Sequence, residues 1–265
     1  MKRNISAIIL LIITIQIIII GGNIYNATVF IMSLIGLNEF IKIKEEKKQV
    51  PILIKTISFV SLTFLILSNM DKIQTYSIDY RILSGIFILF LLPSILYHDK
   101  TKYSINDAFY LIGGTLFIGI TFRLLIPIRT IGKNIIIYLL LISIISDTYA
   151  LITGKLIGKR KLTEISPNKT IEGLIGGLIF GTFVPIIFYK TVINTNMDTI
   201  KLFLITLFLC LLGQLGDLIF SAIKRYFGKK DFSNLIPEHG GILDRLDSIA
   251  FILLGFTFFI NIIGG

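Results

Sequence analysis

Three aspartates, Asp147, Asp217 and Asp244, stand at the ends of apolar segments in this 265-residue chain. Each is close to one of two long polar stretches, residues 153–170 and 224–245. An acidic side chain beside hydrocarbon is costly and usually marks function, although a single aspartate at a helix end can also extend into the lipid headgroups. Hard carboxylate oxygens together with cations favour Mg²⁺ and phosphoryl chemistry.

The segment after Asp217 carries further polar side chains at helical spacing. Asp217, Ser221 and Lys224 follow the pattern i, i+4 and i+7, which places them on one face of a helix. A carboxylate there can hold a divalent metal, while Lys224 and the adjacent Arg225 neutralise phosphoryl oxygens. The alternative is an apolar stripe that ends in a basic membrane anchor.

A turn with exposed backbone N–H groups is expected next. Pro237 and the pair Gly240 and Gly241 interrupt any helix and suit a tight loop that can contact an anion. Asp244 and Asp247 then begin another apolar helix at i and i+3. Acidic residues in a first helical turn are also ordinary capping residues, so both interpretations stay open.

Other chemistries have little support in the sequence. His239 could act as a general base, donate to a phosphate or hydrogen-bond only within its loop. The spacing of Cys and His residues does not match a zinc site, and neither a nucleophile elbow nor a P-loop motif is present. The single cysteine, Cys210, lies in an apolar run and is expected to be a buried filler.

The elements that must position these residues are apolar helices. Hydrophobic residues make up 54% of the chain and charged residues 16%, whereas soluble domains average roughly 45–50% and 25%. We expect an all-α, polytopic integral membrane protein with about nine transmembrane helices. The candidate segments are Ile5–Ile20, Ile24–Ile41, Val50–Ser68, Ile82–Tyr97, Ala108–Ile126, Asn134–Ile152, Ile171–Ile193, Leu202–Phe220 and Leu246–Ile263.

The charge distribution predicts the orientation of these helices. The net charge is +10, and an N-terminus in the cytoplasm places most of the 26 Lys and Arg residues on the cytoplasmic side. Both long polar stretches then face the cytoplasm. The first apolar segment could be a signal peptide, but we expect an uncleaved helix because no small-residue cleavage site follows it. A nucleic-acid partner is not expected, since no basic soluble domain is present.

Residues 221–247, SAIKRYFGKKDFSNLIPEHGGILDRLD, resemble the signature of the phosphatidate cytidylyltransferases, also called CDP-diacylglycerol synthases. The pattern joins Ser-x-x-Lys-Arg, Lys-Asp, His-Gly-Gly and Asp-Arg-x-Asp. The matching positions are Ser221, Lys224, Arg225, Lys230, Asp231, His239, Gly240, Gly241, Asp244, Arg245 and Asp247. So many fixed residues over 27 positions make a chance match very improbable.

A second region supports this resemblance. Residues 147–173 are similar to the family's other motif, whose Ser-Pro-x-Lys-Thr-x-Glu-Gly core falls at Ser166–Gly173. Because both motifs lie in the C-terminal half, we expect residues 1–133 to form scaffold and lipid-facing helices. Residues 134–265 are expected to combine transmembrane helices with the cytoplasmic catalytic loops.

The resemblance implies that CTP and phosphatidate give CDP-diacylglycerol and pyrophosphate at the cytoplasmic face of a bacterial membrane. It also implies a homodimer and a metal centre at Asp217 and Asp244, with Mg²⁺ and a monovalent cation such as K⁺. The residues expected to take part in catalysis are Asp217, Asp244, Lys224, Arg225 and Asp247. The residues expected to bind substrate are Asp147, Ser166, Lys169, Thr170, Glu172, Ser221, Lys230, Asp231, His239 and Arg245.

Two other functions compete with this one. A transporter or channel can also carry charges within its helices, but its acidic residues are expected near the bilayer midplane and in both halves of the chain. A related enzyme could transfer a cytidylyl group to a different lipid phosphate, with the same chemistry at the same residues.

Overall fold

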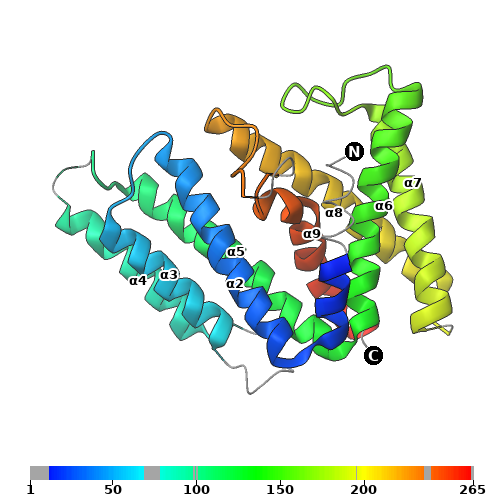
Figure 1. Ribbon diagram of the computed structural model, residues 1–265, viewed down its shortest axis with the longest axis horizontal. Helices are drawn as coiled ribbons and strands as arrows, with labels where there is room; N and C mark the ends of the chain where they lie inside the picture. Colours follow the sequence, from blue (N-terminus) through cyan, green and yellow to red (C-terminus); the bar gives the residue numbers. More distant parts are fainter. Residues whose placement is uncertain are drawn as a thin grey trace. The chain divides into compact units, whose positions relative to one another are not determined.

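The computed structural model describes residues 12–68, 78–97, 99, 101–194, 196–235 and 240–263 (Figure 1). These residues are mostly helical, and an isolated β-bridge joins Lys161 to Thr170. Residues 12–20 are helical. The helices that follow are α2 (Gly22–Glu45), α3 (Ile52–Leu67), α4 (Tyr80–Leu96), α5 (Ile105–Ile131), α6 (Lys133–Ile157), α7 (Ile171–Phe188), the π-helix η1 (Tyr189–Ile193), α8 (Thr199–Tyr226), α9 (Leu243–Phe256), the 3₁₀-helix η2 (Thr257–Phe259) and α10 (Ile260–Ile263). The all-α prediction is therefore confirmed for this part of the chain.

Five of the described helices are long and apolar enough to cross a membrane: α2, α5, α6, α7 with η1, and α8. Helices α3 and α4 are apolar but shorter. The predicted last span, Leu246–Ile263, consists of the three pieces α9, η2 and α10. Much of the predicted first span, Ile5–Ile20, lies outside the described residues. The chain is thus a membrane protein, and five spans are supported by length and composition.

The chain forms two compact units. The first contains residues 1–130 and 231–244, and the second contains residues 131–230 and 245–265. The described residues 231–235 and 240–244, which were expected to belong with the C-terminal helices, thus pack with the N-terminal helices.

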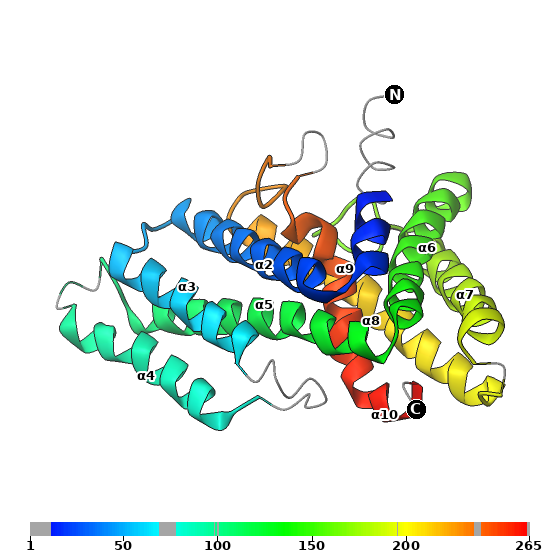
Figure 2. The same ribbon diagram turned by 60° about the horizontal axis from the view of Figure 1, so that its bottom comes forward.

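Helices α2, α3, α4 and α5 make up most of the first unit, and α3 runs alongside α4 in both views (Figures 1 and 2). Helix α2 contacts α5 through the stacked rings of Phe40 and Tyr110, whose centroids are 4.7 Å apart. Helix α5 contacts α3 through Arg123, whose guanidinium donates to the carbonyl of Leu65 and to Ser68 Oγ, both at 2.7 Å. The buried cation therefore satisfies polar groups at the end of α3.

In the second unit, α6 and α7 lie side by side and both contact α8 (Figure 2). The stacked rings of Tyr149 and Phe180, 4.0 Å apart, join α6 to α7. Gln214 on α8 connects all three helices, because its amide donates to Ser146 Oγ of α6 at 2.9 Å and to the carbonyl of Leu174 of α7 at 3.2 Å. Gln214 lies three residues before Asp217. Its buried hydrogen bonds therefore fix the part of α8 that carries Asp217.

Candidate active site

Asp217 lies in α8, nine residues before the end of this helix, and its carboxylate forms an ion pair with Lys169. Lys169 comes from the loop between α6 and α7. The two side chains are 24% and 29% exposed, so the pair is partly shielded from water and still accessible. The structure thus joins Lys169 of the motif at residues 147–173 to α8, the helix that leads into the motif at residues 221–247.

Asp147 approaches the same region from α6. Ser248 Oγ of α9 donates to Asp147 Oδ2 at 3.3 Å, and Ser248 itself is buried. The charges of Asp217 and Asp247 are close enough to act on that of Asp147. Helices α6, α8 and α9 therefore bring three predicted site aspartates together in the second unit.

Basic side chains offset these negative charges. Lys169 and Arg245 act on the Asp147 carboxylate, and Lys224 acts on that of Asp247. Lys224 is itself buried, with 8% of its surface exposed. A group of carboxylates with interspersed cations favours ligands that carry both charges, such as a nucleotide phosphate with a bound metal ion.

A close approach of α8 and α9 positions Asp217 near Asp247. A Cβ atom at Gly216 would lie 2.6 Å from the carbonyl oxygen of Asp247 and 2.7 Å from Phe251 Cδ2. Real Cβ atoms essentially never come this close to such atoms. The two helices can therefore approach each other at the site only because residue 216 has no side chain.

The loop between α6 and α7 is held by hydrogen bonds of its own residues. Thr170 Oγ1 accepts from the backbone N–H of Gly173 at 3.0 Å and caps α7. Glu172 Oε2 accepts from the backbone N–H groups of Lys159 and Arg160 at 3.1 and 3.3 Å. These bonds hold both ends of the loop that carries the ion-pair partner of Asp217.

The backbone around Lys169 is also fixed. Its N–H donates to the carbonyl of Ser166 at 3.0 Å, and its carbonyl accepts from the N–H of Leu162 at 2.8 Å. Ser166 thus lies at the start of a tight turn. The predicted contacts of Ser166 and of the two loop residues Thr170 and Glu172 with substrate stay predictions.

Asp244 belongs to the first unit, where it is buried at the start of α9. Its Oδ2 accepts from the backbone N–H groups of Phe232 at 2.8 Å and Gly241 at 2.9 Å. The carboxylate therefore organises its own loop. The shared metal site of Asp217 and Asp244 stays a prediction from the resemblance, since each lies in its own unit.

The remaining predicted residues are placed as follows. Ser221 is half-buried on α8, Arg225 is exposed and donates to the carbonyl of Lys229 at 3.0 Å, and Lys230 and Asp231 are exposed. His239 lies outside the described residues.

The carboxylates around Asp217 fit Mg²⁺ as a site whose shell water and substrate phosphates would complete. Within residues 12–68, 78–97, 99, 101–194, 196–235 and 240–263, no three His, Cys, Asp or Glu side chains form a ready ligand set. Mg²⁺ usually binds one or two carboxylates and completes its shell with water and substrate phosphates. Asp217, with Asp147 and Asp247 nearby, meets that requirement, because hard oxygen ligands are what Mg²⁺ prefers.

Glu39 is a buried carboxylate that the sequence motifs do not single out. This carboxylate lies inside the predicted span Ile24–Ile41, is 2% exposed, and accepts hydrogen bonds from the start of α9. The rule that singled out the three aspartates, an acidic residue within an apolar helix, also applies to Glu39 and would have found it.

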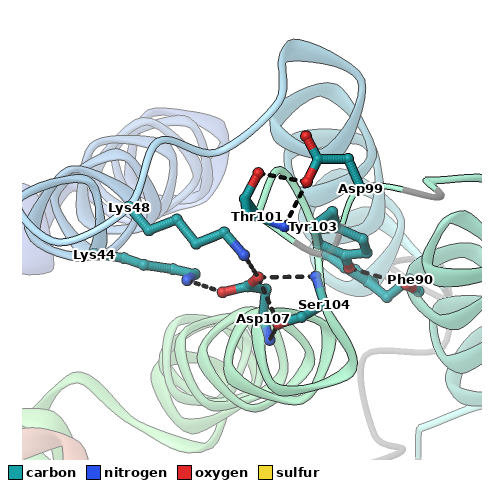
Figure 3. A network of polar contacts seen from close by, with 8 residues as sticks. All are labelled: Lys44, Lys48, Phe90, Asp99, Thr101, Tyr103, Ser104 and Asp107. Carbon is teal, nitrogen blue, oxygen red and sulfur yellow. Dashed lines mark hydrogen bonds and ion pairs between the residues drawn. The ribbon is translucent and has the colours of Figure 1, made fainter.

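A second polar network in the first unit was also missed (Figure 3). Asp107, near the start of α5, forms ion pairs with Lys44 and with Lys48, the latter at 2.5 Å. Ser104 donates to Asp107 through its N–H at 2.9 Å and its hydroxyl at 2.7 Å. The Lys44 ammonium also lies 5.4 Å from the centre of the Tyr110 ring. This network fastens the end of α2 to α5.

The segment before α5 is fixed by local bonds. The N–H and hydroxyl of Thr101 donate to Asp99 Oδ1 at 2.9 and 2.5 Å, and hold the pKa of this carboxyl below its usual range. The hydroxyl of Tyr103 donates to the carbonyl of Phe90 at 2.9 Å, and burial raises its pKa. These contacts anchor the connection from α4 to α5 (Figure 3).

Comparison with known proteins identifies the family. Residues 1–263 match the model of the "Cytidylyltransferase family". The chain belongs to the cytidylyltransferase family. Proteins named phosphatidate cytidylyltransferase are similar to it over 95% of both chains: 37% identical over 256 residues in Staphylococcus haemolyticus, 36% over 253 in Staphylococcus saprophyticus and 38% over 253 in Staphylococcus aureus. A family match of this extent includes both cytidylyltransferase motifs and the N-terminal helices.

Proposed function

We propose that this protein is a phosphatidate cytidylyltransferase that makes CDP-diacylglycerol from CTP and phosphatidate. The observation that carries the proposal is the convergence of Asp147, Asp217 and Asp247 with Lys169. Asp147 and Lys169 belong to the motif at residues 147–173, and Asp247 belongs to the motif at residues 221–247. The names of the staphylococcal relatives supply the substrates.

The reaction needs no nucleophile from the protein. A phosphate oxygen of phosphatidate attacks the α-phosphorus of CTP, forming one P–O bond, while the bond to the β-phosphate breaks and pyrophosphate leaves with the electron pair. The protein must hold two polyanions together and stabilise the charge that develops. Lys169, Lys224 and Arg245 are the proposed cations, because each acts electrostatically on an aspartate of the second unit.

From the resemblance, Asp217 and Asp244 are proposed as Mg²⁺ ligands. Asp147 and Asp247 would add to the negative charge beside Asp217. Mg²⁺ bound there supplies charge neutralisation of the triphosphate. A monovalent cation such as K⁺ is part of the same proposal. Ser221 and Arg225, together with the loop residues Lys230 and Asp231, are proposed to contact the substrates.

The membrane arrangement is also part of the proposal. We propose about nine spans, of which five have the required length and composition, with the site open to the cytoplasm of a bacterial cell. The acyl chains then stay in the bilayer while the phosphate meets CTP from the water. A homodimer is proposed from the resemblance alone.

A turnover assay tests the proposed function. Purified protein is given CTP and Mg²⁺ with phosphatidate or with other lipid phosphates, and pyrophosphate release is measured. Release with phosphatidate supports the proposal, and release only with another lipid phosphate would change the substrate but keep the chemistry. No release with any lipid would favour a transporter.

A further inference from the structure

The buried carboxylate of Glu39 is bonded to the loop that precedes α9, more than 190 residues later in the chain. Its Oε1 accepts from Ser233 Oγ at 2.7 Å and from the N–H of Ile242 at 3.0 Å, and its Oε2 accepts from the N–H of Leu243 at 2.9 Å. The first N–H groups of a helix have no partner within that helix. Glu39 therefore caps α9 from α2, within the first unit.

Glu39 and Asp244 together accept hydrogen bonds from three consecutive backbone N–H groups. Asp244 accepts from Gly241, and Glu39 accepts from Ile242 and Leu243. The Gly-Gly pair fits this arrangement: Gly240 has a φ of +82° and a Cβ there would lie 2.7 Å from Asp244 Oδ2. A Cβ at Gly241 would collide with the Glu39 carboxylate. The two carboxylates thus explain both glycines of the His-Gly-Gly motif.

We propose that Glu39 is a positioning residue for cytidylyl transfer, and this rests on the proposed function. Its carboxylate fixes the backbone of residues 241–243, and through that backbone it fixes the carboxylate of Asp244. An anion at the positive end of a helix is stabilised, which allows a charged residue to remain buried within an apolar helix. Loss of the Glu39 charge should therefore displace the Asp244 carboxylate more than it disturbs the packing of the rest of the first unit.

Glu39→Gln tests the proposal, with Asp107→Asn as the matched control. Both variants turn a buried carboxylate of the first unit into an amide, and the wild-type residues are 2% and 6% exposed. In Glu39→Gln one carboxylate oxygen becomes an NH₂ group, which cannot accept a backbone hydrogen bond. Asp244 is the proposed metal ligand, and Glu39 is its supporting partner. Removing such a partner typically costs about 10–100-fold in metal affinity or activity.

We expect Glu39→Gln to lower kcat about 10–100-fold and to raise the Mg²⁺ concentration for half-maximal rate, with a smaller change in KM for CTP. Asp107→Asn should keep the kcat of the folded protein and its Mg²⁺ dependence. Two outcomes would make Glu39 a stabilising residue and overturn the proposal. One is an equal loss of kcat in both variants. The other is a loss of kcat in Glu39→Gln that a smaller folded fraction fully explains.

A spin label gives a readout that does not depend on turnover. Asn234 is exposed on the same loop and Cys210 is buried, so Asn234→Cys can be labelled selectively with a nitroxide. Adding Glu39→Gln should increase the mobility of the label, and unchanged mobility would contradict the proposal. If wild-type protein is inactive with CTP and phosphatidate while the mobility still rises, the proposed function fails but the positioning of the loop by Glu39 stands.

Ser233→Ala covers the case in which Glu39→Gln does not fold. It removes one hydrogen bond to Glu39 Oε1 and leaves the charge in place. We expect the same direction of change in kcat and Mg²⁺ dependence with a smaller size. Wild-type values in Ser233→Ala, together with an unfolded Glu39→Gln, would assign Glu39 to stability alone.

Discussion

Gly216→Ala should lower activity much more than it lowers stability. The new Cβ would lie 2.6 Å from the carbonyl oxygen of Asp247, about 0.8 Å short of the 3.4 Å at which ordinary contact begins. Helix α9 must therefore shift relative to α8 by most of that distance, next to Asp217. A displacement of about 1 Å at a reacting centre can cost about 100-fold in rate.

The stability change is expected to be smaller. Overpacking costs about 1–3 kcal/mol, and replacing glycine by alanine within a helix returns about 0.5–1 kcal/mol. Thermal unfolding in detergent and initial rates of pyrophosphate release, both with saturating CTP, measure the two effects. The control is Gly113→Ala in α5, where a Cβ meets nothing within 4 Å. Wild-type kcat in Gly216→Ala would show that activity does not depend on the close approach of α8 and α9.

Further predictions concern the ion pair, the loop and the topology. Asp217→Asn should abolish turnover and leave membrane insertion and unfolding temperature near wild type, since it removes a charge and little volume; full activity would exclude Asp217 from the metal site. Thr170→Ala should lower the free energy of unfolding by about 1 kcal/mol through loss of the α7 cap, as measured by chemical denaturation, and an unchanged value would mean that the cap contributes nothing. Glu164→Cys, in the exposed loop between α6 and α7, should react with a membrane-impermeant maleimide only from the cytoplasmic side; labelling from outside would reverse the proposed orientation.

Helices could be predicted from apolar runs because hydrocarbon requires them. The predicted Ile171–Ile193 has the bounds of α7 with η1, and Leu202–Phe220 lies within α8. Leu246–Ile263 is different, because it is divided by the 3₁₀-helix η2. Hydropathy reports how apolar a segment is, and gives no information on whether one regular helix runs through it.

Side-chain chemistry singled out candidate site residues, and their roles stay predictions. Asp147, Asp217 and Asp247 meet in the second unit, but Asp147 and Asp217 lie well inside α6 and α8 and not at the helix ends that hydropathy predicted. The contacts of Glu39 depend on backbone N–H groups about 200 residues away, which no local pattern encodes. For the same reason, the association of residues 231–244 with the first unit could not be derived from hydropathy.

The most direct test of the account is the fate of the α-phosphate of CTP. With CTP labelled at that phosphate, phosphatidate and Mg²⁺, wild-type protein should transfer the label to the lipid phase, and Asp217→Asn should leave it in the aqueous phase. Label that stays in water with active wild-type membranes, or equal transfer by Asp217→Asn, would contradict a cytidylyl transfer centred on the aspartates of α6, α8 and α9.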